Sequence, residues 1–336
     1  MVLPGIPNID QIGFYDVTRL KRTRLGTQTK PTGGGTTVVQ LNPTGLLRGV
    51  HLAITAVVTG TPDAANALGI CSAIRNVRLT TNNSVDIYNS SGAGYVYAVN
   101  EMLNTELQVG LGTTYNQGAS AVAAGTFRLD MYLPVQMNWR DPIGLFLLQN
   151  REINVNLIIE WESDTTVTGG ATATYTATAL PIVEYFTVPA DARLMPDLSL
   201  VHQITEESRT VSGAGDVTYE PITGQVYLAI AYGAFWAQSA ADGFSRFQEI
   251  VGASDRWMDE TVGSLDGLYY LTRGRNRRAG TILRDFFGSA GLGFLSETDR
   301  DVFDTLNTTN FQHIITATGA GTLRIVKRQL VRVGSN

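Results

Sequence analysis

Hydrophobic and polar residues alternate along much of this chain with a period of two. In residues 44–58, TGLLRGVHLAITAVV, the even positions from Val50 to Val58 are all apolar. Residues 223–235, TGQVYLAIAYGAF, alternate in the same way from Val226 to Ala234. Because successive side chains of a strand point to opposite faces, both runs are predicted to be long strands with a buried face. Their likeness suggests corresponding core strands in two similar halves of the chain.

Further strands are predicted on both sides of these two runs. Residues 152–163 give the clearest alternation, with apolar side chains from Ile153 to Ile159 set against polar neighbours. Glycine-rich and threonine-rich turns separate the predicted strands. The others are 36–41, 74–90, 126–137, 173–188, 198–211, 265–274, 281–288, 310–318 and 321–333.

Three stretches depart from this pattern and are predicted to be short helices inside connecting loops. They are residues 93–110, 239–252 and 295–306. In the second of them Phe244, Phe247 and Ile250 recur every three residues, which is typical of one face of a helix. These helices interrupt strands at irregular intervals, so a βαβ arrangement is not indicated.

The order of these elements predicts an all-β fold of two tandem eight-stranded antiparallel jelly rolls, each a β-sandwich. The proline-containing segment 187–199 separates two strand-rich halves, and we place the boundary near residue 192. Residues 1–192 then hold an N-terminal arm and the first jelly roll, and residues 193–336 hold the second.

Composition agrees with a β-rich protein and narrows the classes of function. The chain has 336 residues, 35 glycines and 16% charged residues, and the low charge argues against long surface helices. Its net charge of −5 gives no reason to expect sequence-specific nucleic-acid binding. The single cysteine, Cys71, excludes an intrachain disulfide and is predicted to be buried. No run of 18 apolar residues is present.

The sequence offers little for catalysis, and we expect neither an enzyme nor a cofactor. The three histidines, His51, His202 and His313, lie far apart in predicted strands and lack metal-binding spacing. Glu160, Glu162 and Asp164 would share one face at a strand end and form a weak candidate for calcium. A solvated sheet edge is the favoured interpretation of these carboxylates.

Two basic stretches are candidates for contacts with other molecules, although solvated turns explain them equally well. The first precedes the first strand and contains Arg19, Lys21, Arg22 and Arg24. We predict a terminal arm that contacts an anionic membrane surface or a neighbouring subunit. The second, with inter-subunit ion pairs as the hypothesis, contains Arg273, Arg275, Arg277 and Arg278.

Two tandem jelly rolls with the matching strands 44–58 and 223–235 resemble the double jelly-roll major capsid proteins of tailless icosahedral viruses. That lineage includes tectiviruses, corticoviruses, adenovirus hexon and small single-stranded DNA phages of the Flavobacterium-phage type. The resemblance covers nearly the whole chain and is one of architecture and length.

The resemblance implies a structural protein of a bacteriophage or virus, assembled in the host cytoplasm into the capsid of the virion. Such proteins form homotrimers of pseudo-hexagonal outline that contact neighbouring capsomers and penton or minor capsid proteins. An internal viral membrane commonly lies beneath the shell, and the basic N-terminal residues would then face inward.

A second interpretation stays open at this point: a virion spike, receptor-binding or carbohydrate-binding β-sandwich protein. Its sugar-stacking candidates are the four tryptophans, which are scattered along the chain. They are Trp139, Trp161, Trp236 and Trp257. Buried packing is the commoner use of such residues.

Overall fold

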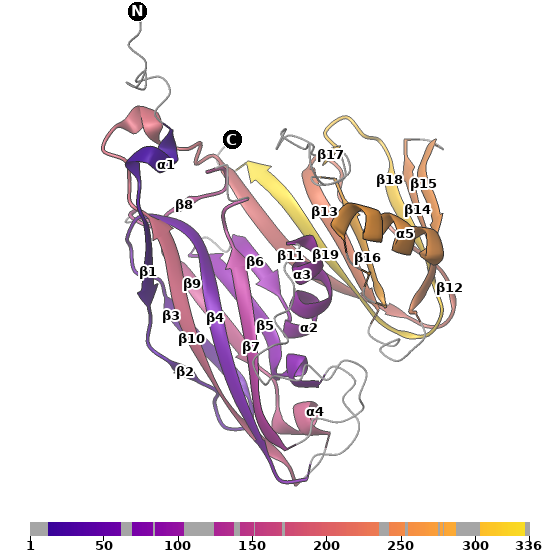
Figure 1. Cartoon of the computed structure of the whole chain (residues 1–336), viewed down its shortest axis with the longest axis horizontal. Coiled ribbons are helices and arrows are strands. Elements are labelled where there is room, and N and C mark those ends of the chain that lie inside the picture. The colour runs from indigo at the N-terminus through magenta and orange to yellow at the C-terminus, as the bar shows by residue number, and fades with distance from the viewer. Residues whose placement is uncertain are drawn as a thin grey trace, which may run out of the picture.

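The structure is a computed structural model, and the chain folds into two β-sandwiches that lie side by side (Figure 1). The structure describes most of residues 13–332. The exceptions within that span are 62–68, 83–84, 104–123, 138–141, 151, 170–171, 235–241, 253–254, 275, 278 and 287–302. Among the described residues no helix is long and apolar enough to cross a membrane.

The first sandwich has the strand order of a jelly roll. Its eight principal strands, counted along the chain, pair as 1-8-3-6 in one sheet and as 2-7-4-5 in the other. The first sheet contains β1 (Leu20–Arg24), β10 (Thr174–Phe186), β4 (Leu46–Thr59) and β7 (Gly125–Pro134). The second contains β3 (Gly35–Gln40), β9 (Val155–Trp161), β5 (Ile74–Thr81) and β6 (Asp86–Ser90). Two short strands, β2 (Gln28–Thr29) and β8 (Phe146–Leu147), pair with the first sheet.

The second sandwich repeats the same order. The 1-8-3-6 strands are β11 (Leu200–Val211), β19 (Gly321–Arg332), β13 (Val226–Ala234) and β16 (Thr281–Asp285). The 2-7-4-5 strands are β12 (Gly215–Tyr219), β18 (Phe311–Ala317), β14 (Phe244–Val251) and β15 (Asp255–Thr261). A short strand, β17 (Phe303–Asp304), pairs with β13. The predicted pair of eight-stranded jelly rolls is confirmed, and the two look-alike runs form β4 and β13, the third strand of each.

Each jelly roll has a helical connection between its fifth and sixth strands. In the first, α2 (Gly92–Gly94), the π-helical η3 (Tyr95–Val99) and α3 (Asn100–Met102) follow one another, and we call them the 92–102 helix. In the second, the connection is α5 (Val262–Arg273). The remaining helices are α1 (Phe14–Val17), η2 (Gly69–Ala73), α4 (Asp164–Thr168) and η4 (Ala192–Leu194).

Two predicted elements are wrong in type. Residues 239–252 were expected to be helical, but 244–251 form β14, where a β-bulge between Phe244 and Arg246 brings Phe244 and Phe247 to the buried side. Residues 265–274 were expected to be a strand, but 265–273 belong to α5, in which Leu265 and Tyr269 are buried four residues apart. The bulge gives the buried residues of β14 the three-residue spacing of a helix, and the aromatic residues of α5 resemble those of a strand.

The other two predicted helices can be compared with the structure only in part. The 93–110 segment is helical as far as Met102, and its remainder from 104 lies outside the described residues. Residues 295–302 also lie outside them, and 303–304 form β17 where a helix was expected. Strand β10 ends at Phe186 and β11 begins at Leu200. The domain boundary near residue 192 stays a prediction.

The two jelly rolls are joined by a parallel strand pair. Tyr88 and Asn89 of β6 pair with Ile204 and Thr205 of β11, so that one nine-stranded sheet runs through both sandwiches. The 92–102 helix lies between the sandwiches, as Figure 1 shows. This junction sets how one half of the chain is held against the other.

Candidate functional site

The junction between the jelly rolls is a hydrophobic core that both halves share. The buried residues Val96 and Val99 of the 92–102 helix belong to the same core cluster as Ala229, Ala231 and Val326 of the second jelly roll. The helix contacts β13, β16 and β19, which means that it covers the outer face of the second jelly roll's first sheet. The pair of sandwiches therefore packs like one body.

Glu206 of β11, in the second jelly roll, binds the start of the 92–102 helix of the first jelly roll. Its carboxylate accepts hydrogen bonds from the Ser91 backbone N–H at 2.6 Å, from the Ser91 hydroxyl at 2.9 Å and from the Ser90 hydroxyl at 2.9 Å. Arg324 of β19 donates to the same carboxylate at 2.6 Å. Negative charge is favoured at a helix N-terminus, because the first N–H groups of a helix lack internal partners.

Gly94 is required by this arrangement. A Cβ at that position would lie 2.0 Å from Oε2 of Glu206. The Gly94 N–H donates to the Ser91 hydroxyl at 2.9 Å, and the same hydroxyl donates to Glu206. The sequence SSGAG at residues 90–94 therefore combines a helix cap with room for a carboxylate from the other jelly roll.

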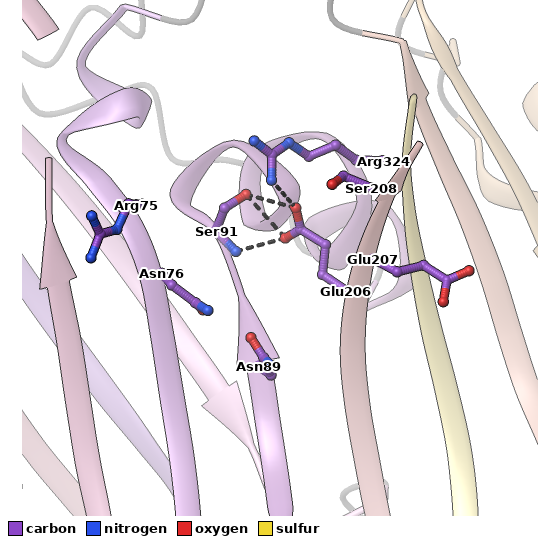
Figure 2. A pocket seen from close by; sticks show the side chains of 8 residues that line it. All are labelled: Arg75, Asn76, Asn89, Ser91, Glu206, Glu207, Ser208 and Arg324. Carbon is purple, nitrogen blue, oxygen red and sulfur yellow. Dashed lines mark hydrogen bonds and ion pairs between the residues drawn. The ribbon is translucent and has the colours of Figure 1, made fainter. Parts of the chain in front are cut away.

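A shallow cavity of about 150 Å³ opens beside this carboxylate. Figure 2 shows Ser91 and Arg324 both directed toward the Glu206 carboxylate, with Asn76 and Asn89 on the neighbouring strands of the first jelly roll. The lining residues are Arg75, Asn76, Asn89, Ser91, Glu206, Glu207, Ser208 and Arg324. Because the hydrogen-bonding groups at its centre hold the two halves together, we interpret the cavity as part of the junction.

His202 forms a second polar contact across the junction. Its Nδ1 lies 3.3 Å from the carbonyl oxygen of Val135 in the first jelly roll, and its Nε2 accepts from Nε of Arg328 at 2.9 Å. Arg328 also donates to the carbonyl of Met137. A neutral ring with its proton on Nδ1 satisfies both contacts. Burial and the neighbouring Arg328 hold the pKa of His202 well below its usual value.

Helix α5 reaches the same junction from the other side. The Tyr269 hydroxyl donates to the carboxylate of Glu101, which is buried at the end of the 92–102 helix. Arg273 donates to the backbone carbonyl of Glu101 at 2.6 Å and forms an ion pair with Asp285. The two helices of the two jelly rolls are thereby linked.

Two residues of the second basic stretch, Arg273 and Arg277, form ion pairs inside the chain. Arg273 is used within the chain as described above. Arg277 is nearly fully buried and pairs with Asp242 and Asp266. Its intramolecular ion pairs leave it unable to serve as an exposed inter-subunit cation. Arg275 and Arg278 lie outside the described residues.

The first basic stretch is an edge strand, where a loose terminal arm was expected. β1 pairs with β10, and the exposed residues Arg19, Lys21, Arg22 and Arg24 lie along this edge of the sheet. Arg22 forms an ion pair with Glu184 at 2.6 Å. What these side chains contact in an assembly stays a prediction.

The carboxylates at the end of β9 have separate partners. Glu160 pairs with Arg75 at 3.1 Å and with Arg78 at 2.7 Å, while Asp164 pairs with Lys30 at 2.6 Å. Glu162 accepts from the Ser163 N–H. Within the described ranges no group of three histidine, cysteine or acidic side chains could hold a metal ion. The weak calcium candidate therefore gains no support from the geometry.

Several important polar residues escaped the sequence reasoning. Glu206 lies in an ordinary polar run, and nothing local indicates that its partners are 115 residues away. The buried Glu249 and His313, with the partly exposed Arg284, are likewise brought together from three strands of the second jelly roll. The helix cap at Ser91 was the one local signal available.

Comparisons with known proteins find similar folds among solved structures. No protein-family model matches the chain, and no curated protein sequence matches it. Among solved structures it is similar to STIV MCP, from Sulfolobus Turreted Icosahedral Virus, with a TM-score of 0.70 and 12% identity. The match covers 94% of this chain and 97% of that one.

The chain has the double jelly-roll fold of viral major capsid proteins. It is also similar to the PBCV-1 virus capsid, with a TM-score of 0.61 and 11% identity over 95% of this chain and 97% of that one. For the major capsid protein P2 from Bacteriophage PM2 the TM-score is 0.54 and the identity 12%, over 95% and 99% of the two chains. At these identities the likeness is one of fold.

Proposed function

We propose that this chain is the major capsid protein of an icosahedral virus and that it assembles as a homotrimer. The observation that carries the proposal is the match of the whole double jelly roll, over 94% of this chain, to a capsid protein of nearly the same extent. The junction supports it, because Glu206 and the 92–102 helix make one stiff building block from two sandwiches.

The building block suits a structural role better than a catalytic one. The buried polar groups of the junction donate to and accept from one another, which is the arrangement expected of groups that hold shape. A shell subunit needs stiff lateral faces. Each chain contains two fused jelly rolls, so three chains around a three-fold axis would give six of them. The chain is then a component of the virion, with neighbouring capsomers and minor capsid proteins as its partners.

Host type, assembly in a host cytoplasm and an internal membrane belong to the same proposal as expectations. For the basic residues of β1 we propose contact with a neighbouring subunit, because these residues lie along a sheet edge. Edge strands with open hydrogen-bonding groups are natural sites of association between chains.

The mass of the purified full chain in solution tests this function. One chain has a mass of 36.3 kDa, so multi-angle light scattering should give about three times that value. Electron micrographs of the same sample should contain capsomers of hexagonal outline or closed shells. A persistent monomer that binds sugars on a glycan array would instead favour the carbohydrate-binding alternative.

A further inference from the structure

The junction inside the chain has a counterpart in elements that the described structure leaves exposed. Inside the chain, the fifth strand of one jelly roll (β6) pairs with the first strand of the next (β11), and the helix after the fifth strand covers the next sheet. The corresponding elements elsewhere are β15 and α5 of the second jelly roll and β1 of the first. Within the described residues β15 pairs with β14 alone, and β1 with β10 alone.

These counterpart elements expose large apolar side chains to solvent, whereas the elements of the internal junction bury theirs. Ile87 and Tyr88 of β6 are buried, whereas Trp257 of β15 is 52% exposed. The 92–102 helix buries Val96 and Val99, whereas α5 exposes Tyr270 by 58% and Leu271 by 67%. Large apolar side chains exposed to solvent are typical of surfaces where proteins associate.

The first jelly roll carries the matching receiving surface. The sequence Leu-Ala-Ile occurs at 52–54 in β4 and at 228–230 in β13, which hold the same place in the two jelly rolls. Ala229 is buried in the core that the 92–102 helix shares. Its counterpart Ala53 is partly exposed, and Val57 on the same face of β4 is exposed. The same face also carries Thr55 and, on the neighbouring strand β7, the ion pair of Arg128 with Asp130, so it presents polar groups beside the small and apolar ones.

Charge on the two exposed edges is complementary. The β1 sequence LKRTR carries three cationic and no anionic side chains. The β15 sequence DRWMDET carries three carboxylates and one guanidinium. Opposite charges along two strand edges favour their pairing and oppose the pairing of either edge with itself.

We propose that a second copy of this chain repeats the internal junction: its β1 pairs in parallel with β15, and its β4–β10 face covers the exposed side of α5. This inference rests on the proposed function and names the surfaces that build the trimer. The two surfaces differ, so the contact is head-to-tail and generates a ring if the rotation closes. β1 and β15 lie at opposite sides of the molecule, as Figure 1 shows, so one chain can serve two neighbours.

The apolar half of the contact is tested by Leu271→Asp in the full chain, with Leu306→Asp as the matched control. Leu271 and Leu306 are similarly exposed, at 67% and 65%, but Leu306 follows β17, which is not one of the strands or helices assigned to the proposed contact. Light scattering should show an about threefold loss of mass for Leu271→Asp and none for Leu306→Asp. A trimeric Leu271→Asp overturns the inference and leaves the proposed function standing. A monomeric wild-type protein overturns the function itself.

The charged half is tested by a charge exchange. Lys21→Glu with Arg24→Glu, and Asp255→Lys with Glu260→Lys, should each raise the trimer dissociation constant by about tenfold or more. The chain with all four substitutions should return to within about threefold of wild type. Failure to recover, in a chain whose circular dichroism is unchanged, contradicts the strand pairing.

A lipid partner gives a different result. Binding to vesicles of phosphatidylserine and phosphatidylcholine, lost on reversal of Lys21 and Arg24 while the trimer mass stays the same, would assign β1 to a membrane and overturn the inference.

Discussion

At the scale of single residues, a carboxylate from one jelly roll holds a helix of the other. Glu206 receives hydrogen bonds from Ser90, Ser91 and Arg324, and its side chain is only 5% exposed. A charge removed from water in this way needs all its partners. Loss of the charge should therefore cost far more than the loss of an ordinary surface ion pair.

Glu206→Gln should lower the free energy of unfolding by about 3 kcal/mol, because the helix N-terminus and Arg324 lose their charged partner. Urea denaturation followed by tryptophan fluorescence measures this. The matched control is Glu207→Gln next in sequence. Glu207 is 38% exposed and pairs with Lys327 at 3.3 Å, so its loss should cost less than about 1 kcal/mol. Equal costs for the two substitutions would contradict the role given to Glu206.

Two buried histidines make stability depend on pH. Burial lowers the pKa of His313 and, together with Arg328, that of His202 below the ordinary 6.5. Below pH 6.5 the unfolded chain therefore binds protons that the native chain does not. Stability should be full above this pH and should fall as the pH decreases, by at most about 1.4 kcal/mol per pH unit for each histidine.

Denaturation at pH 7.5 and pH 5.5 tests this dependence, and His202→Gln should reduce the difference between the two values. Glu249 adds little in this window. Burial raises its pKa, but hydrogen bonds from His313 and Arg284 outweigh burial and lower the pKa below 4.5, so its contribution is lost only in stronger acid. A stability that is flat or rises toward pH 5.5 would refute the neutral state of the two rings.

At the scale of elements, the period of the hydrophobic pattern predicted most strands but missed local irregularities. β4 and β9 were visible because one clean face is buried along each of them. β14 was not, because its bulge shifts Phe244 and Phe247 out of the two-residue period. Helix α5 had recognisable limits in Thr261, whose hydroxyl accepts from the Ser264 N–H, and in Gly274 at a φ of 68°. Its aromatic residues outweighed these signals.

Helix α5 should depend on its contact with the first jelly roll. Tyr269→Phe removes the hydroxyl that donates to the buried Glu101, and we expect a loss of about 1.5–3 kcal/mol in the free energy of unfolding. Its neighbour Tyr270 is mostly exposed, and Tyr270→Phe should change this free energy by less than about 0.5 kcal/mol. Measurements on dilute protein keep subunit contacts out of the comparison. The same cost for both substitutions would show that α5 is not anchored through Glu101.

At the scale of the whole molecule, the sequence predicted the two tandem jelly rolls but not how they are fused. The likeness of residues 44–58 and 223–235 indicated a duplication, and the strands they form hold the same position in both sandwiches. The parallel pair of β6 and β11 joins segments more than a hundred residues apart, which no local pattern reveals. For the same reason the sequence did not reveal the ion pairs that Arg273 and Arg277 form inside the chain.

In the proposed capsid role, the fused pair lets one chain supply two similar units to a shell. Each jelly roll offers a first-strand edge and a fifth-strand edge with its helix, and the internal junction uses one of each. The unused β1 edge is basic and the unused β15 edge is mostly acidic. In the head-to-tail contact proposed above, a closed ring of three would cover both of these edges.

A cryo-EM reconstruction of the purified full chain tests this account most directly. It should resolve a ring of three chains and six jelly rolls, with β15 of each chain beside β1 of the next and Leu271 buried at the contact. A single chain, or a two-fold dimer that joins identical surfaces and leaves β1 and β15 exposed, would contradict it.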